Sequence, residues 1–283
     1  MTSSKSNFSL SALVQLTRFW NLVIIAMAQY FTAFFLIGPH TFRDIHLFTL
    51  CVSTVLIAAA GYIINDYYDV KIDLINKPER VVIGKTVGRR YAIFLHTFLS
   101  LAGVALGLLL SWQIALANFA AAFLLWFYSN HLKRKPFFGN ALVALLTGFS
   151  VALVAILYAQ HQIIIYVYAG FAFFMTLIRE IIKDAEDLKG DNTYGCKTLP
   201  ILWGLPKTRR FIYLLTAVFL VLVFVIHFAI QQLPIGYFVA FFLVPLVLLM
   251  VQLSRADTRR DFFNLSTLCK VIMLLGILSM SVV

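Results

Sequence analysis

The sequence predicts an all-α, polytopic membrane protein with nine transmembrane helices. Hydrophobic residues make up 61% of the 283 residues and charged residues only 12%, whereas soluble domains average about 25% charged residues. The mean hydropathy is +0.90. Apolar runs of about 18 residues or more, each long enough to cross a membrane, recur along the chain. One transmembrane domain over residues 1–283 is therefore expected, with residues 1–18 as its cytoplasmic or interfacial N-terminal segment.

Polar or helix-breaking residues separate the nine apolar segments. Very short connections at Ser111 and His161 predict antiparallel neighbours. The longer breaks contain proline, which interrupts helices: Gly38-Pro39, Pro78, Pro136, Pro206 and Pro234. The expected spans are, in order, 19–37, 46–67, 91–110, 112–130, 139–159, 162–182, 211–231, 235–252 and 262–282.

The distribution of basic residues supports this map. Of the 23 Lys and Arg residues, 22 fall on one side of the membrane and Arg43 alone falls on the other. Because cytoplasmic loops carry an excess of Lys and Arg, the N-terminus is predicted to be cytoplasmic and the C-terminus external. The same rule accounts for the basic surplus, so no nucleic-acid partner is expected. Cys51, Cys196 and Cys269 match no metal or redox spacing.

Nine of the twelve acidic residues form two clusters, each at the cytoplasmic end of a span and in the long connection that follows it, about 68–90 and 183–210. Three aspartates in each cluster are separated by three and then four residues, so on a helix each trio falls within an arc of about 60°. Glu79 accompanies the first trio, and Glu180 and Glu186 accompany the second. The first trio is Asp66, Asp69 and Asp73, and the second is Asp184, Asp187 and Asp191.

Carboxylates on one helix face repel each other and are costly to bury near lipid, so a cation is expected to neutralise them. Mg²⁺ suits this role because it binds a few carboxylate oxygens, keeps several waters and bridges to substrate phosphates. Two such faces could hold a diphosphate between them through the metal. The alternative for either trio is a solvated helix end.

Basic and aromatic residues near the clusters are candidates for phosphate binding. Arg suits bidentate phosphate contacts and Lys point-charge contacts, but topology and anionic lipid headgroups explain many basic residues as well. Tyr128 could contact a phosphate or a cation, or could be an interfacial aromatic residue. The six scattered histidines receive no catalytic role. The basic residues concerned are Lys77, Arg80, Lys85, Arg89, Arg90, Lys133, Arg134, Lys135, Lys183, Lys189 and Lys197.

These motifs resemble those of the UbiA superfamily of membrane prenyltransferases, over nearly the whole chain. The first cluster reads N-D-x-x-D-x-x-x-D from Asn65, and the second reads Asp187-x-x-x-Asp191 within R-E-I-I-K-D-A-E-D-L-K-G-D, followed by G-C-K-T-L-P-I-L-W-G. Weaker matches are Arg18-x-x-Asn21, Tyr128-Ser129 with Lys133-Arg134, and Gly139-Asn140.

The resemblance implies nine helices around a central cavity with an acidic cytoplasmic mouth, in the cell (inner) membrane. It implies that Mg²⁺, with Mn²⁺ able to substitute, grips a prenyl diphosphate donor whose allylic C–O bond ionises before a lipophilic acceptor attacks. The implied catalytic and metal-binding residues are Asp66, Asp69, Asp73, Asp184, Asp187 and Asp191, with Asn65 as a neutral metal ligand. The implied substrate-binding residues are Asn65, Arg18, Asn21, Lys77, Arg80, Tyr128, Lys133, Arg134, Asn140, Lys183 and Lys197.

Within the family, the second motif most resembles the branch that prenylates geranylgeranylglyceryl phosphate, and I-N-K-P-E-R at 75–80 resembles that branch's I-N-K-P-x-R. That branch usually continues R-P-I-P-S-G, whereas this chain reads Arg80-Val81-Val82-Ile83-Gly84. A geranylgeranyl donor and ether-lipid synthesis are therefore expected. The alternatives are an aromatic quinone precursor or a chlorophyllide as acceptor, or a cation transporter that uses the acidic faces as an ion site.

Overall fold

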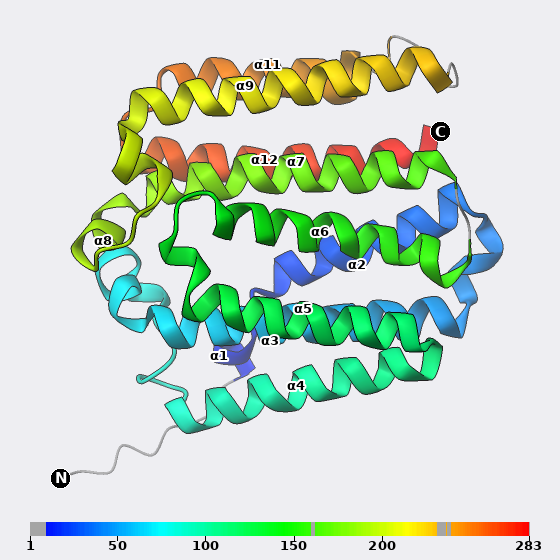
Figure 1. Cartoon of the computed structure of the whole chain (residues 1–283), viewed down its shortest axis with the longest axis horizontal. Coiled ribbons are helices and arrows are strands. Elements are labelled where there is room, and N and C mark those ends of the chain that lie inside the picture. The colour runs from blue at the N-terminus through cyan, green and yellow to red at the C-terminus, as the bar shows by residue number, and fades with distance from the viewer. Residues whose placement is uncertain (1–9, 160–161, 231–235, 237–238, 283) are drawn as a thin grey trace. The chain divides into compact units, whose positions relative to one another are not determined.

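The computed structural model is helical throughout the part of the chain that it describes, and in that part a lone bridge between Ile83 and Val87 is the only β-type pairing (Figure 1). The all-α prediction is confirmed. Residues 1–9, the connection at His161 and the break at Pro234 lie outside the described residues, which are 10–159, 162–230, 236 and 239–282.

The helices follow the apolar segments closely. Short 3-10 turns at Pro39–Arg43, Pro78–Arg80, Leu132–Arg134 and Met280–Val282 lie in the connections or at the end of the last helix, and a π-helical stretch covers Val239–Leu243. The α-helices are α1 (Leu10–Leu16), α2 (Phe19–Leu36), α3 (Ile45–Asn76), α4 (Arg89–Leu110), α5 (Trp112–Asn130), α6 (Phe138–Leu157), α7 (Ile163–Glu186), α8 (Leu188–Thr193), α9 (Leu199–Ile230), α11 (Val244–Ser254) and α12 (Arg259–Ser279).

Eight helices in the described residues are long and apolar enough to cross a membrane. They correspond to all the predicted spans except the eighth, 235–252. There the chain has a shorter apolar helix, Val239–Ser254, and part of the predicted span lies outside the described residues. The prediction of a multi-pass membrane protein is confirmed, since so many helices could not bury their apolar surfaces in a chain of this size without lipid.

Two helices differ in length from the predicted spans. Helix α3 has 32 residues, about 48 Å at 1.5 Å per residue. It exceeds the hydrocarbon core of about 30 Å, so its last turns can carry charge. Helix α9 begins at Leu199 instead of 211, but it consists of two helical segments. The backbone leaves the helical conformation at Gly204 (φ 74°), so the expected break lies two residues before Pro206, which falls in the first turn of the second segment, where proline is tolerated.

The chain forms two compact units, the first comprising residues 1–26 and 48–132 and the second residues 27–47 and 133–283. In the first unit α4 packs against α5. The Asn118 amide, which is buried, donates to the Ser53 hydroxyl at 3.3 Å and to the Gly103 carbonyl at 3.1 Å. This polar contact joins α3, α4 and α5 where no water competes, as polar residues do between membrane helices.

Helix α7 is the central element of the second unit and packs against α6, α9 and α12. Figure 1 shows α7 (green) and α12 (red) side by side along most of their length. Small residues permit these contacts, as is common between membrane helices. A Cβ at Gly148 of α6 would lie 2.7 Å from the Ala169 carbonyl oxygen of α7, and one at Gly276 of α12 would overlap the Phe171 ring.

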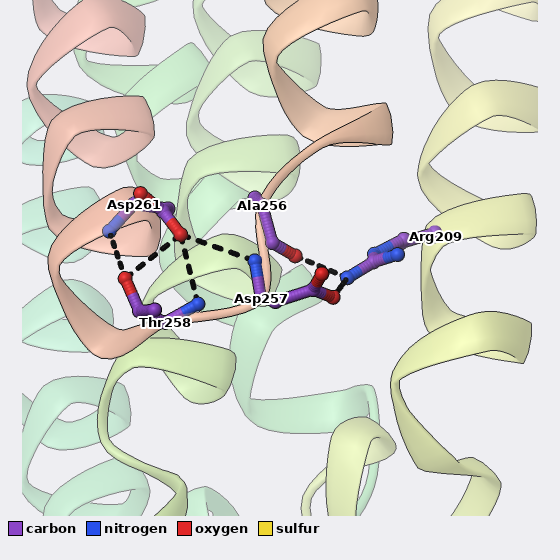
Figure 2. A network of polar contacts seen from close by, with 5 residues as sticks. All are labelled: Arg209, Ala256, Asp257, Thr258 and Asp261. Atoms are coloured by element: carbon purple, nitrogen blue, oxygen red, sulfur yellow. Dashed lines mark hydrogen bonds and ion pairs between the residues drawn. The ribbon is translucent and has the colours of Figure 1, made fainter.

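A network of polar contacts fastens the connection between α11 and α12 to α9 (Figure 2). The Arg209 guanidinium of α9 donates to the Ala256 carbonyl and, at 2.6 Å, to the Asp257 carboxylate. Thr258 and Asp261 form a capping box at the start of α12, in which each side chain accepts from the other residue's backbone N–H. The free N–H groups of the first turn are thereby satisfied, and this loop is set at a defined position on α9.

Candidate active site

The first aspartate motif lies on one uninterrupted helix. Asp66, Asp69 and Asp73 all belong to α3, as the three-and-four spacing predicts. The Arg18 guanidinium donates to Asp66 at 2.8 Å and lies 5.0 Å from the centre of the Tyr62 ring. Burial works against the charged form of Arg18, but the Asp66 charge and hydrogen bond outweigh it and raise the pKa of Arg18. Asp66 is therefore already compensated by one fixed cation.

Arg18 itself has an unusual backbone. It connects α1 to α2 with a φ of 51°, in the left-handed region that non-glycine residues rarely adopt. Such strained residues are found preferentially at functional sites. Asn21, three residues on, donates its backbone N–H to the Arg18 carbonyl at 2.8 Å. The Arg18-x-x-Asn21 element thus forms the turn that directs the guanidinium towards Asp66.

Asn65 has a side-chain oxygen atom that no described residue contacts by a hydrogen bond. Its side-chain Oδ1 is buried and has no hydrogen-bond partner among the described residues. A buried carbonyl oxygen without a donor is costly, by about 1–3 kcal/mol, and a carbonyl oxygen is a suitable ligand for Mg²⁺. The structure thus leaves this atom available in the way that a metal or substrate contact requires.

The loop after the first motif is folded against α1. Ala12 and Leu16 of α1 are buried with Val82, Ile83 and Val87 of the loop. The Gln15 amide donates to the Arg80 carbonyl at 3.2 Å, and the Lys85 ammonium donates to the Pro78 carbonyl at 2.8 Å. The departure from R-P-I-P-S-G therefore has a packing explanation, because Val82 and Ile83 anchor the loop by burying apolar side chains.

The basic residue Lys77 closes α3 and is largely buried, and its backbone N–H donates to the Asp73 carbonyl at 2.7 Å. Lys77 and Arg80 lie at the two ends of the turn that follows the first motif. Tyr128, on α5, belongs to the same unit. The expected substrate-binding roles of the three residues remain predictions.

The second motif is not a single helical face. Asp184 lies on α7, Asp187 is the junction residue at which α7 ends, and Asp191 lies on the short helix α8. The expectation that this trio occupies one stripe of one helix is therefore corrected. Asp187 has φ −93° and ψ 9°, outside the α-helical range, so the chain bends there. The i to i−4 hydrogen bonds from Asp187 and Asp191 continue across the bend.

Two sequence-predicted residues are brought together at Asp184. The Asn140 amide of α6 donates to the Asp184 carboxylate at 2.9 Å, and both side chains are largely removed from water. This hydrogen bond fixes one oxygen of the Asp184 carboxylate and thereby also sets the direction of the other oxygen. Further along, the Lys197 backbone N–H donates to the Arg134 carbonyl at 3.0 Å, so the two basic segments that contain Lys133, Arg134 and Lys197 lie together.

One charged residue next to this motif, Arg179, was not among the residues predicted from the sequence. Arg179 of α7 donates to the Glu180 carboxylate at 2.6 Å, and Lys183 lies 3.9 Å from the same carboxylate. The Arg179 and Glu180 side chains are only 14% and 12% exposed. An adjacent Arg and Glu inside a predicted span was the signal that could have revealed it, since ionisable residues within membrane helices are functional candidates by default.

The donor atoms present fit Mg²⁺. No group of three or more His, Cys, Asp and Glu side chains forms a complete metal site in the residues that the structure describes. Mg²⁺ does not require one, because it usually binds one or two carboxylates together with water and substrate phosphates. The aspartates spaced one turn apart on α3 and the Asn65 oxygen are donor atoms of the type that such partial coordination would use.

Comparisons with known proteins agree on one family. The model of the UbiA prenyltransferase family matches residues 26–268. A digeranylgeranylglyceryl phosphate synthase from Saccharolobus solfataricus is 33% identical over 246 residues, 86% of this chain and 83% of that protein. One from Korarchaeum cryptofilum is 32% identical over 241 residues, 84% of this chain and 85% of that protein.

Solved structures share the fold. A structure of a digeranylgeranylglyceryl phosphate synthase in membranes has a TM-score of 0.70 at 21% identity, covering 96% of this chain and 97% of that one. A UbiA homologue from Archaeoglobus fulgidus bound to GPP and Mg²⁺ has a TM-score of 0.69 at 18% identity, covering 95% and 99%. The expected resemblance is confirmed, and the chain is an integral membrane prenyltransferase that belongs to the UbiA prenyltransferase family.

Proposed function

We propose that this enzyme transfers a geranylgeranyl group from its diphosphate to the free hydroxyl of geranylgeranylglyceryl phosphate, in ether-lipid synthesis. The observation that carries the proposal is the match to two digeranylgeranylglyceryl phosphate synthases at 32–33% identity over more than 80% of each chain. The loop after the first motif, which departs from that branch's usual sequence, keeps a folded structure through Val82 and Ile83.

Both aspartate motifs are proposed to act on the same diphosphate. Mg²⁺ would be held by residues of both motifs: Asn65, Asp66, Asp69 and Asp73 from the first, and Asp184, Asp187 and Asp191 from the second. When bound, Mg²⁺ supplies charge neutralisation and Lewis-acid stabilisation to the departing pyrophosphate. The Mg²⁺ and GPP in the Archaeoglobus homologue support this assignment.

The chain's own residues prepare the reaction by orientation and charge. Arg18 holds Asp66, and Asn140 holds Asp184, so neither carboxylate has to be ordered when the donor binds. Lys77, Arg80, Lys183 and Lys197 add positive charge near the leaving group. The bond between C1 of the donor and its diphosphate oxygen breaks with both electrons leaving on oxygen. The acceptor hydroxyl oxygen then bonds to C1 and releases its proton.

A direct assay tests this proposal. Purified protein with Mg²⁺ and geranylgeranyl diphosphate is incubated with geranylgeranylglyceryl phosphate, a hydroxybenzoate, a dihydroxynaphthoate, homogentisate or a chlorophyllide, and products are identified by mass spectrometry. The doubly prenylated glyceryl lipid is the expected product. Transfer to an aromatic acid, with none to the glyceryl lipid, would refute the proposed acceptor.

The proposed orientation places the N-terminus and both motifs in the cytoplasm and the C-terminus outside, because 22 of 23 basic residues fall on one side of the sequence map. A reporter that is active only in the cytoplasm is fused to the C-terminus and, in a second strain, to the N-terminus. Activity is expected from the N-terminal fusion alone. Activity from the C-terminal fusion would contradict the map.

A further inference from the structure

Two buried hydrogen-bond donors on α7 have no partner among the described residues. The Thr176 hydroxyl is one, in a residue only 4% exposed, and the Arg179 Nε is the other. Other helical threonines behave differently: Thr32, Thr54, Thr147, Thr208 and Thr216 each donate to the carbonyl four residues earlier. That bond is the usual way to satisfy a hydroxyl within an apolar helix, and Thr176 forgoes it.

The ion pair of Arg179 engages Nη1 of its guanidinium. Nη1 donates to the Glu180 carboxylate, whose other oxygen lies 3.9 Å from Lys183, and Nε has no partner among the described residues. Arg179 is the seventeenth residue of α7, about 24 Å along a helix that rises 1.5 Å per residue. Measured from the start of α7, this distance is shorter than the hydrocarbon layer of about 30 Å, and a charged side chain within that layer requires a specific partner.

Helix geometry shows where this group faces. Asp184 contacts Asn140 of α6, and the Arg179 and Glu180 charges act on the buried Cys269 thiol of α12. At about 100° per residue, Thr176 lies between the directions of Arg179 and Asp184 on the helix surface. The polar residues of α7 therefore occupy the sector between α6 and α12, and they run from Thr176 towards the motif residues Asp184 and Asp187.

Donors of this kind call for a ligand rich in acceptor oxygens. The Nε–H of Arg is a permanent donor and forms part of the planar fork that matches phosphate and carboxylate oxygens. A ligand with a single neutral hydroxyl would satisfy only one of the two donors. A phosphate or carboxylate group presents several acceptor oxygens, so it can accept from both donors, and its hydrogen bond to a guanidinium is charge-assisted.

We propose that Thr176 and Arg179 bind the anionic head of the acceptor. This inference rests on the proposed function, in which that head is the phosphate of geranylgeranylglyceryl phosphate. Arg179 is five residues from Asp184, about 7.5 Å along the helix. The acceptor's charged head would therefore bind about 7.5 Å nearer the start of α7 than Asp184, which helps to hold the diphosphate. Binding the two substrates through different residues of α7 keeps the acceptor phosphate from competing for the donor's metal ligands.

Two substitutions test the assignment by steady-state kinetics with each substrate varied separately. Thr176→Val removes a hydroxyl that bonds to no described residue, so the fold should be retained. Arg179→Lys keeps the charge beside Glu180 and removes Nε and the planar fork. Each should raise KM for the acceptor about tenfold or more, which corresponds to about 1.4 kcal/mol per tenfold, and should leave KM for the donor unchanged. The preference for the phosphorylated acceptor over geranylgeranylglycerol should fall in parallel.

Thr216→Val is the matched control. Thr216 is equally buried, and its hydroxyl is already bonded to the Ile212 carbonyl of α9, so neither KM should change. An unchanged acceptor KM in Thr176→Val and Arg179→Lys would overturn the inference, as would a rise in the donor KM instead. If the wild-type enzyme prenylates an aromatic acid and not the glyceryl lipid, the proposed function fails. The same variants, assayed with that acid, then decide the inference by the same criterion.

Discussion

At the scale of single residues, the unused oxygen of Asn65 gives a test of metal binding. Asn65→Leu keeps the approximate volume and removes a carbonyl oxygen that bonds to nothing described. The Mg²⁺ concentration for half-maximal activity is expected to rise about tenfold, as for loss of one contact of about 1.4 kcal/mol. Wild-type activity should vanish in excess EDTA and return with Mg²⁺ or Mn²⁺. Undiminished turnover in EDTA would exclude the proposed mechanism, and an unshifted Mg²⁺ requirement in Asn65→Leu would exclude the Asn65 contact.

Asp44 offers a residue-scale test outside the motifs. Its carboxylate accepts from the Tyr158 hydroxyl at 2.7 Å and from the His46 backbone N–H at 2.9 Å. Partial burial raises the pKa of Asp44, but these hydrogen bonds outweigh it and lower the pKa below its ordinary value. A carboxyl group whose pKa is lowered by folding stabilises the fold at pH values above its unfolded-state pKa, which is about 3.9 for Asp. This stabilisation is lost as the pH falls through the lower pKa of the folded state.

Asp44→Asn should therefore lower the melting temperature at pH 7. It should also make the melting temperature fall less steeply as the pH decreases below about 4, the range set by the unfolded-state pKa of Asp. Differential scanning fluorimetry of the detergent-purified protein measures both. Tyr158→Phe, which removes one donor and keeps the carboxylate, should lower the melting temperature less and retain most of the acid dependence. Identical melting curves for wild type and Asp44→Asn would show that this contact between the α2–α3 connection and the end of α6 is not stabilising.

At the scale of elements, close helix contacts in the second unit depend on glycine. Gly148→Ala would place a Cβ 2.7 Å from the Ala169 backbone oxygen, whereas Gly170→Ala meets nothing within 4 Å. The first should destabilise the protein by about 1–3 kcal/mol through overpacking, because a backbone carbonyl cannot move aside easily. The second should stabilise it by up to about 1 kcal/mol through helix propensity. Thermal melts of the two variants, compared with wild type, check the opposite signs. Equal melting temperatures would contradict the α6–α7 contact.

At the scale of the whole molecule, the two aspartate motifs are expected to act as one device. Asp69→Asn and Asp187→Asn should each lower kcat by at least about 100-fold, about 2.7 kcal/mol. Residues that act as a unit are strongly non-additive, so the double variant should be little worse than the poorer single one. Independent sites would instead give a loss of about 10⁴-fold. Near wild-type activity in Asp187→Asn, with an inactive Asp69→Asn, would show that the second motif is a solvated helix end at that position.

The sequence by itself determined the features that depend on residues close together along the chain, namely the positions of the helices and the faces on which the motif residues lie. Apolar length specified the membrane helices, and the three-and-four spacing placed Asp66, Asp69 and Asp73 on one face of α3. The paired aspartate motifs also identified the family, since such patterns are local in the sequence. Proline marked the break within α9 to within two residues, since the chain bends at Gly204 and Pro206 lies in the first turn that follows.

Only the tertiary structure decided which distant residues meet. Arg18 with Asp66, Asn140 with Asp184, and the loop residues Val82 and Ile83 with α1 are contacts across 44 residues or more. The bend at Asp187 also depends on the tertiary structure, as does the absence of a hydrogen-bond partner for the Thr176 hydroxyl among the described residues. The spacing of a motif specifies a helix face but not the neighbour opposite it. Which polar atoms are satisfied, and which stay open for a substrate, depends on that neighbour.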